Sequence, residues 1–347
     1  MGGVDRAALK WVWTIFLFAL VTFVVYQVRH TLVIFALALF LSHLLAPVVD
    51  FFARTGSRRI PRVAVITLVY AGALVLVILA LVSIGGKIGE EAASLAVRVR
   101  DLMNQPDPLS HIPIPSWLNS VRPAAEPAVK RWLADLEQHV LPLISSAGVQ
   151  ILSGIGSMLS AILIPILSFF FLKDGASIRR TIVDSFPRHN QTVVNEILVD
   201  LHELLAQYIR ALVLLSLAAF AFYAGFLSMA SVPYAILLAG VAAIFEFIPV
   251  VGPLTASAAI LLVAAFMGYS HLLWIVAFLA IYRVFQDYVL SPYLMSAGVE
   301  IHPLLVLFGV LAGEQLAGVP GMFFSVPTMA ALRVIFIRLR RNRRADA

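Results

Sequence analysis

The chain has 347 residues, of which 61% are hydrophobic and 13% charged, and its formal net charge is +6. Soluble globular domains average about 45–50% apolar and about 25% charged residues, so this composition excludes a water-soluble globule. Because the chain contains no cysteine, disulfides, thiol catalysis and cysteine-ligated metals are also excluded. Several uncharged runs of about 18 residues or more are long enough to cross a bilayer as helices, which predicts an all-α polytopic membrane protein.

The N-terminal region, residues 1–86, contains three apolar stretches that we predict to be membrane helices, at about 11–28, 32–52 and 63–86. A tight turn at Arg29 and His30 is expected between the first two. The loop before the third helix has four arginines and no acidic residue. The positive-inside rule places this loop, and with it the N-terminus, in the cytoplasm.

The largest polar region follows at residues 87–146 and is expected to form an extracytoplasmic arm. An apolar stripe predicts an amphipathic helix at 88–103, and a second is predicted at about 128–143. The stretch between them, 105–127, is rich in proline and is expected to be extended or looped. Two interpretations remain open for the arm: a lid or oligomer contact, or a solvated connector lying on the membrane.

The transport region is predicted at residues 147–337 and begins with a helix at about 149–172 that returns to the cytoplasm. Apolar residues at helical spacing in 193–208 predict an amphipathic helix lying at the interface. It leads into a further membrane helix at about 211–231. The arginine-rich tail, 338–347, is expected in the cytoplasm, where its charges contact anionic lipid headgroups rather than nucleic acid.

Two apolar segments, 233–269 and 303–337, are each broken by proline and glycine, and a full helix at 271–291 lies between them. If both segments are re-entrant hairpins, the chain has about six full transmembrane helices; if they span, it has about eight or more. The joints Val250-Val251-Gly252 and Gly318-Val319 contain no charge, which favours re-entrant hairpins because such turns gain little from reaching water. The expected turn residues are Pro253, Gly318, Pro320 and Gly321.

Each hairpin carries a carboxylate. Glu246 lies beside Pro249 and Gly252, and an ionised group at this depth must face a cavity or a partner. It therefore predicts a proton or cation site; alternatively, it bonds to backbone groups freed around the turn and only holds the hairpin together. Glu314 and Gln315 occupy the corresponding place in the second hairpin, and paired interruptions of this kind are typical of a site formed by broken helices. The alternative is a pair of solvated interfacial residues.

Four polar residues interrupt the helix between the hairpins. Arg283 and Asp287 are spaced i, i+4 and are predicted to form a structural ion pair. Alternatively Gln286 and Asp287, with Tyr288, are ligands in the same cavity. Together with Glu246, Pro249, Gly252, Glu314 and Gln315, they are the candidate substrate- and ion-binding residues.

Enzyme motifs are incomplete in this chain. The run His202-Glu203-Leu204-Leu205-Ala206 starts like a zinc-protease motif, but Ala206 stands where the second histidine is needed. There is no Walker A sequence, so ATP-driven pumping is not indicated. We expect no enzyme activity, no cofactor and no resident metal.

A set of short stretches occurs in a characteristic order along the chain: Phe169-Phe170-Phe171-Leu172-Lys173-Asp174, Tyr208-Ile209-Arg210, Phe245 to Pro253, Gln286 to Pro292, Val299 to Leu304, Gly313, Gly318, Gly321 and Val326-Pro327. In these stretches the chain resembles the autoinducer-2 exporter (AI-2E) family of bacterial permeases. One departure concerns Glu314, which follows Gly313 where the family often has paired glycines. The resemblance implies a multi-pass protein of the bacterial inner membrane that transports either autoinducer-2 or sodium and lithium in exchange for protons.

The residues and the resemblance together predict a secondary-active transporter that exports a small polar signalling molecule, driven by a proton or cation gradient. Its site is expected between the two hairpins and helix 271–291. The alternatives are a monovalent cation/proton antiporter, a passive channel, and a structural or scaffold protein acting through its arm. The expected partners are the lipid bilayer, a small polar solute, H⁺ and Na⁺, and further copies of the chain in a homo-oligomer.

Overall fold

The computed structural model describes residues 6–55, 61–104, 127, 130, 131, 134, 155–294 and 302–345, and every regular element in these ranges is helical. Five helices are long and apolar enough to cross a membrane: Arg29–Thr55, Arg62–Asp101, Arg188–Met229, Leu272–Leu294 and Leu304–Arg341. The predicted all-α polytopic membrane protein is confirmed. The proline-rich stretch at 105–127 and the second arm helix at 128–143 lie almost wholly outside the described residues.

The first two helices, α1 (Arg6–Gln27) and α2 (Arg29–Thr55), are separated by a single residue, Val28. The Val28 N–H donates to the Val24 carbonyl and the Leu32 N–H donates to the Val28 carbonyl, both at 3.0 Å. Helical hydrogen bonding therefore continues through the joint, and the predicted tight turn at Arg29 and His30 is wrong. Neither residue is a glycine or proline, so nothing there forces the helix to end, and the chain only bends.

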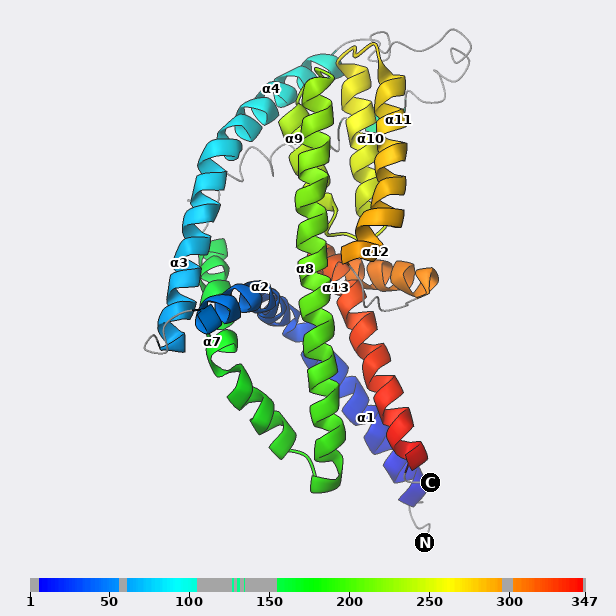
Figure 1. Cartoon of the computed structure of the whole chain (residues 1–347). Coiled ribbons are helices and arrows are strands. Elements are labelled where there is room, and N and C mark those ends of the chain that lie inside the picture. The colour runs from blue at the N-terminus through cyan, green and yellow to red at the C-terminus, as the bar shows by residue number, and fades with distance from the viewer. Residues whose placement is uncertain are drawn as a thin grey trace.

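The third membrane helix and the first arm helix form one curved rod (Figure 1). It consists of α3 (Arg62–Ala80), a π-helical segment η1 (Leu81–Gly85) and α4 (Gly86–Met103). The predicted helix at 88–103 is therefore present, but it continues the preceding helix. Its apolar stripe packs over the end of the bundle formed by α8 to α11.

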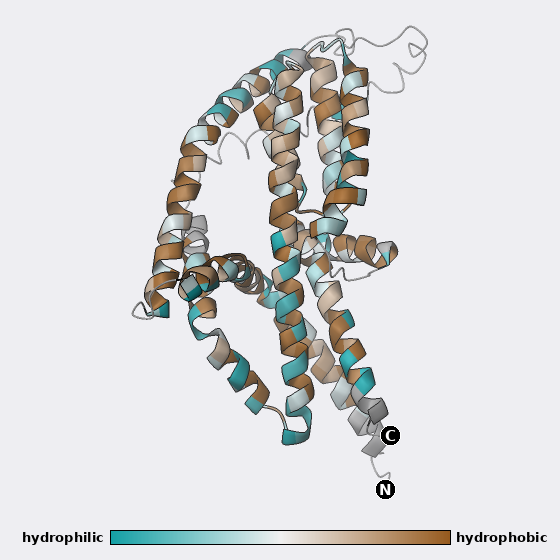
Figure 2. Cartoon of the chain, viewed as in Figure 1, coloured by the Kyte–Doolittle hydropathy of each residue, from teal (hydrophilic) through white to brown (hydrophobic). Residues whose placement is uncertain are grey.

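The central element is α8 (Arg188–Met229), whose 42 residues correspond to a length of about 63 Å at 1.5 Å per residue. It follows α7 (Ile155–Asp184), which packs against α2. The predicted helix at 193–208 is present, and it runs without a break into the predicted membrane helix at 211–231. Hydrophilic residues gather on its N-terminal half and apolar residues on its C-terminal half (Figure 2).

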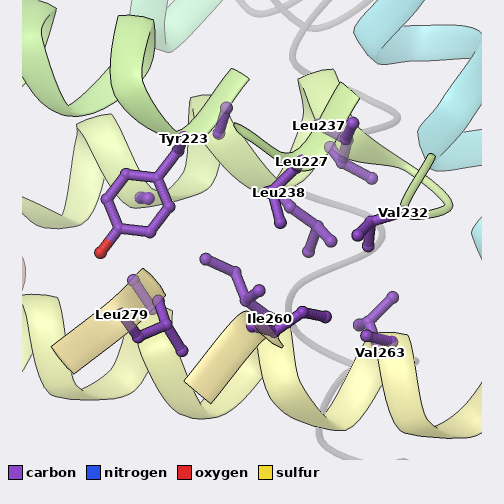
Figure 3. Close-up of a cluster of buried hydrophobic side chains, with 14 of the residues drawn as sticks. Tyr223, Leu227, Val232, Leu237, Leu238, Ile260, Val263 and Leu279 are labelled. Carbon is purple, nitrogen blue, oxygen red and sulfur yellow. The ribbon is translucent and has the colours of Figure 1, made fainter. Parts of the chain in front are cut away.

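The first broken segment folds back on itself beside the C-terminal half of α8. It consists of α9 (Ala235–Phe245) and α10 (Val251–Phe266), and it is followed by α11 (Leu272–Phe285), the π-helical η5 (Gln286–Leu290) and α12 (Ser291–Leu294). Apolar side chains from α8, α9, α10 and α11 fill the space between these helices (Figure 3). At about 16 Å, α9 is too short to cross ~30 Å of hydrocarbon, which favours re-entry.

The second broken segment reverses within α13 (Pro303–Ala345), at Ala317 and Gly318. Gly318 has a φ of 62°, a value that favours glycine. The two legs approach so closely that a Cβ on Gly321 would lie 1.9 Å from the Gly313 carbonyl oxygen. The chain thus turns back at both of the predicted joints.

Candidate functional site

A buried carboxylate lies at the tip of the first hairpin. Glu246 immediately follows α9 and is 9% exposed, and Gln286, the first residue of η5, is 3% exposed. The Gln286 Nε2 donates a hydrogen bond to Glu246 Oε1. Because the donor is a neutral amide, this contact supports the carboxylate without cancelling its charge.

The tip of this hairpin is a tight and strained reversal. Val250 has φ 65° and ψ −57°, and the Val251 N–H donates to the Pro249 carbonyl at 2.7 Å. A positive φ is unfavourable for a β-branched residue, and such strain is found most often at functional sites. Gly252 closes the reversal, because a Cβ at that position would lie 1.8 Å from the Phe245 carbonyl oxygen.

A cavity of about 320 Å³ opens beside Glu246. Its walls come from α8, the hairpin tip, the η5–α12 segment and the second leg of α13. The lining residues are Leu204, Gln207, Tyr208, Leu212, Leu215, Glu246, Pro249, Val250, Pro253, Arg283, Gln286, Asp287, Ser291, Val326, Pro327 and Ala330. The volume is at the lower end of the ~300–1,000 Å³ typical of small-molecule sites, and a mostly apolar wall with a few polar groups is also typical.

The charged residues of the cavity are unequally paired. Arg283 Nε and Asp287 Oδ2 are 2.8 Å apart, so the ion pair expected from the i, i+4 spacing is present. Both side chains are partly exposed. With this pair neutralised, Glu246 is the lining carboxylate that has no cation at hydrogen-bonding distance among the residues that the structure describes.

Two tyrosines adjoin this group on the side of the apolar core. Tyr282 lies one turn before Gln286, is 3% exposed, and its hydroxyl has no hydrogen-bond partner among the described residues. Its ring centroid is 4.9 Å from that of Tyr223 on α8. A buried hydroxyl left unpaired costs about 1–3 kcal/mol, and Tyr282 belongs to the hydrophobic core beside the site rather than to the cavity lining.

The structure brings some predicted residues together and separates others. Glu246, Pro249, Gln286 and Asp287 all line the cavity, as do Arg283 and the turn residue Pro253, while Gly252 lies in the turn that forms its wall. Tyr288 is 78% exposed and lies outside the lining.

Glu314 and Gln315 are also exposed and outside the lining. The second hairpin contributes its later leg instead, through Val326, Pro327 and Ala330. Gly318, Pro320 and Gly321 lie at the reversal itself, away from the cavity wall.

The sequence reasoning did not identify the contribution of α8 to the cavity. Leu204, Tyr208, Leu212 and Leu215 recur at helical spacing with Gln207 among them, and all five line the cavity. Helical periodicity alone does not distinguish a cavity wall from a face that lies against lipid. The run Tyr208-Ile209-Arg210, which also contributes to the family resemblance, is the sequence feature that points to this part of α8.

An all-helical membrane protein with a buried carboxylate on a broken hairpin, next to a cavity of solute size, has the architecture of a membrane transporter. The comparison with protein families agrees with this class. The family model described as AI-2E family transporter matches residues 15–341, almost the whole chain. The chain therefore belongs to the AI-2E family of transporters.

Individual relatives are transport proteins by name. The Bacillus subtilis (strain 168) protein named "Putative transport protein YueF" is 25% identical over 345 residues, covering 95% of this chain and 93% of the relative. "Putative transport protein YrrI" of the same organism is 28% identical over 201 residues, 55% of this chain and 56% of its own length. "Putative transport protein MT0215" of Mycobacterium tuberculosis (strain CDC 1551 / Oshkosh) is 32% identical over 172 residues, 49% of this chain and 47% of that protein.

Proposed function

We propose that this transporter is a secondary-active carrier that exports a small polar signalling molecule of the autoinducer-2 type. In this carrier Glu246 binds and releases a proton or cation, and the gradient of that ion across the membrane drives the export. The observation that carries the proposal is the buried Glu246–Gln286 hydrogen bond at the wall of a cavity of about 320 Å³. A group that changes charge inside such a cavity couples ion binding to solute binding. A bound ion changes the electric field in the cavity and so the affinity for the solute, and a bound solute changes the affinity for the ion in return.

The composition of the cavity favours a polar solute as cargo. Gln207, Tyr208, Gln286 and Ser291 supply neutral hydrogen-bonding groups on several sides. Hydroxyl groups of a small polyhydroxylated ring pair well with amides and hydroxyls of this kind. A bare monovalent cation needs neither this number of neutral groups nor this volume.

The alternative is exchange of sodium or lithium for protons. Its support is the presence of a second carboxylate, Asp287, in the same lining as Glu246. Hard cations prefer oxygen ligands, which these two groups and the carbonyls of the hairpin tip supply. In this version Asp287 exchanges its ion pair with Arg283 for the bound cation.

The proposal extends to topology and assembly. The arginines at 54–62 and 338–344 support cytoplasmic N- and C-termini, with residues 1–86 as a membrane region, 87–146 as an extracytoplasmic arm and 147–337 as the transport region. We place the protein in a bacterial inner membrane, as a homo-oligomer. Cysteine substitutions labelled from either side of intact cells test the orientation, since the natural chain contains no cysteine.

The carrier function is tested by solute accumulation in proteoliposomes under an imposed pH or sodium gradient. Autoinducer-2 inside the vesicles is measured for the natural chain, for Glu246→Gln and for the matched control Glu314→Gln, which lies outside the cavity. The proposal expects gradient-driven accumulation that Glu246→Gln abolishes and Glu314→Gln retains. Accumulation that is unaffected by Glu246→Gln would contradict it.

A further inference from the structure

The amphipathic helix α4 reaches across to cap the first hairpin. The Leu237 N–H donates to Glu91 Oε2 at 2.8 Å. Leu237 is the third residue of α9, and the first four N–H groups of a helix have no partner within the helix. The residue before α9, Tyr234, has a φ of 61° and offers no side-chain cap. Glu91, from a distant part of the sequence, fills this role.

The carboxylate is supported by apolar packing along the same face of α4. Ala92, Leu95 and Val99 are buried in the cluster that includes Leu237 and Leu238. These residues join α4 to the same hydrophobic core into which α9 packs. The negative charge of Glu91 also lies at the positive end of the α9 dipole, which strengthens the attachment.

The two helices approach closely further along α9. A Cβ placed on Gly240 would lie 3.3 Å from the Cδ1 of Ile88, a separation tighter than ordinary contact. The attachment of α4 therefore extends over the first half of α9 and is not limited to one hydrogen bond.

The opposite end of α9 carries Glu246. Near that end, the Ser216 hydroxyl on α8 donates to the Ala243 carbonyl at 2.7 Å. The whole of α9 is a single short helix of 11 residues, and the two attachments lie near its two ends. A short helix moves as a rigid body, so a displacement where Glu91 holds it is transmitted to the carboxylate at the other end.

We propose that Glu91 is a positioning residue for the Glu246 site, and that α4, the first helix of the predicted arm, acts as a strut that holds the hairpin in its binding-competent position. The proposal rests on the proposed role of Glu246 in transport. If Glu91 has this role, α4 helps to position the Glu246 site and is not a passive connector. Releasing the strut lowers the population of the competent hairpin, and the apparent affinity for ligand falls by the same factor.

The structural half of the test uses hydrogen–deuterium exchange on the full-length protein in lipid nanodiscs. Three variants are compared: Glu91→Ala, which removes the acceptor; Glu91→Gln, which keeps a neutral acceptor; and Glu90→Ala, a matched control at an exposed neighbouring position. Glu91→Ala is expected to raise the exchange of amides in 237–253, including the hairpin tip, by about tenfold. Glu91→Gln is expected to raise it less, and Glu90→Ala to leave it unchanged.

The functional half measures the apparent affinity and the maximal rate of transport for the same variants. Glu91→Ala is expected to weaken the apparent affinity severalfold, by the factor by which the competent hairpin becomes less populated, with partial recovery in Glu91→Gln. The proposed role of Glu91 would be overturned if amide exchange at 246–253 were unchanged in Glu91→Ala. It would also be overturned if Glu91→Ala and Glu90→Ala changed amide exchange equally. The exchange measurement needs no transport, so the strut and the carrier role of Glu246 can fail separately.

Discussion

Replacing Gly252 with alanine is expected to open the tip of the first hairpin and to disable transport. The added Cβ would lie 1.8 Å from the Phe245 carbonyl oxygen and 2.8 Å from its carbon, whereas ordinary contact begins at 3.4 Å. The two backbone segments must therefore separate by about 1.6 Å, as the difference between 3.4 and 1.8 Å shows. No rotamer change relieves the clash, because the opposing atoms belong to the backbone.

The energetic scale follows from this displacement. Overpacking costs about 1–3 kcal/mol, and a clash with backbone belongs at the upper end. At about 1.4 kcal/mol per factor of ten, ~3 kcal/mol reduces the equilibrium constant for closing the tip about 100-fold. Glu246 directly follows Phe245, so the same movement takes its carboxylate out of hydrogen-bonding distance of Gln286.

The assay is the initial rate of gradient-driven solute transport in proteoliposomes, with helicity and gel filtration to confirm folding. Gly225→Ala on α8 is the matched control, because nothing lies within 4 Å of a Cβ at that position. A glycine-to-alanine change inside a helix is neutral or stabilising by up to about 1 kcal/mol. We expect Gly252→Ala to lose at least about tenfold in rate, given the ~3 kcal/mol above, and Gly225→Ala to retain the natural rate. Natural transport by Gly252→Ala would refute the geometry of the tip.

Three further changes probe the site and its frame. Gln286→Met removes the hydrogen-bond donor of the buried Glu246 carboxylate, at a cost of about 1–3 kcal/mol. The transport rate of the folded variant should therefore fall at least about tenfold. An unchanged transport rate would argue against a role for the Glu246–Gln286 hydrogen bond. Tyr282→Phe removes a buried hydroxyl that has no partner among the described residues, so thermal stability should not fall; a clear loss of stability would show that the hydroxyl is paired. Arg338→Gln breaks the ion pair between Arg338 Nε and Asp200 Oδ2, which are 2.6 Å apart. A small loss of thermal stability is expected, and it should shrink in high salt because salt screens exposed charges. A loss that does not depend on salt would contradict an electrostatic contribution of this pair.

The hairpins were predictable because their signals are local. Glycine and proline flank an apolar run in each, and no charge marks a solvent loop at either joint. The i, i+4 spacing of Arg283 and Asp287 likewise specified the ion pair directly. Glu246 beside Gly252 was identified for the same reason, since a carboxylate in an apolar run is conspicuous without any knowledge of its neighbours.

The remaining features depend on contacts between distant segments. Whether Gln207 and Tyr208 face lipid or a cavity is decided by α13 packing beside α8, which periodicity alone does not reveal. The predicted breaks at Arg29-His30 and after residue 86 do not occur, because polar residues and the glycines Gly85 and Gly86 are also accommodated within continuous helices. The capping of α9 by Glu91 joins residues 146 positions apart, and no local pattern indicates it.

The role of Glu246 as the carrier of the coupling ion can be tested by following proton movement in proteoliposomes. Purified protein is reconstituted with an internal pH-sensitive dye, and sodium, lithium and autoinducer-2 are added in turn to the natural chain and to Glu246→Gln. We expect autoinducer-2 to trigger a proton flux that Glu246→Gln abolishes. A flux triggered only by sodium or lithium would favour antiport instead. A flux of the same size in the natural chain and in Glu246→Gln would contradict the claim that Glu246 is the coupling site.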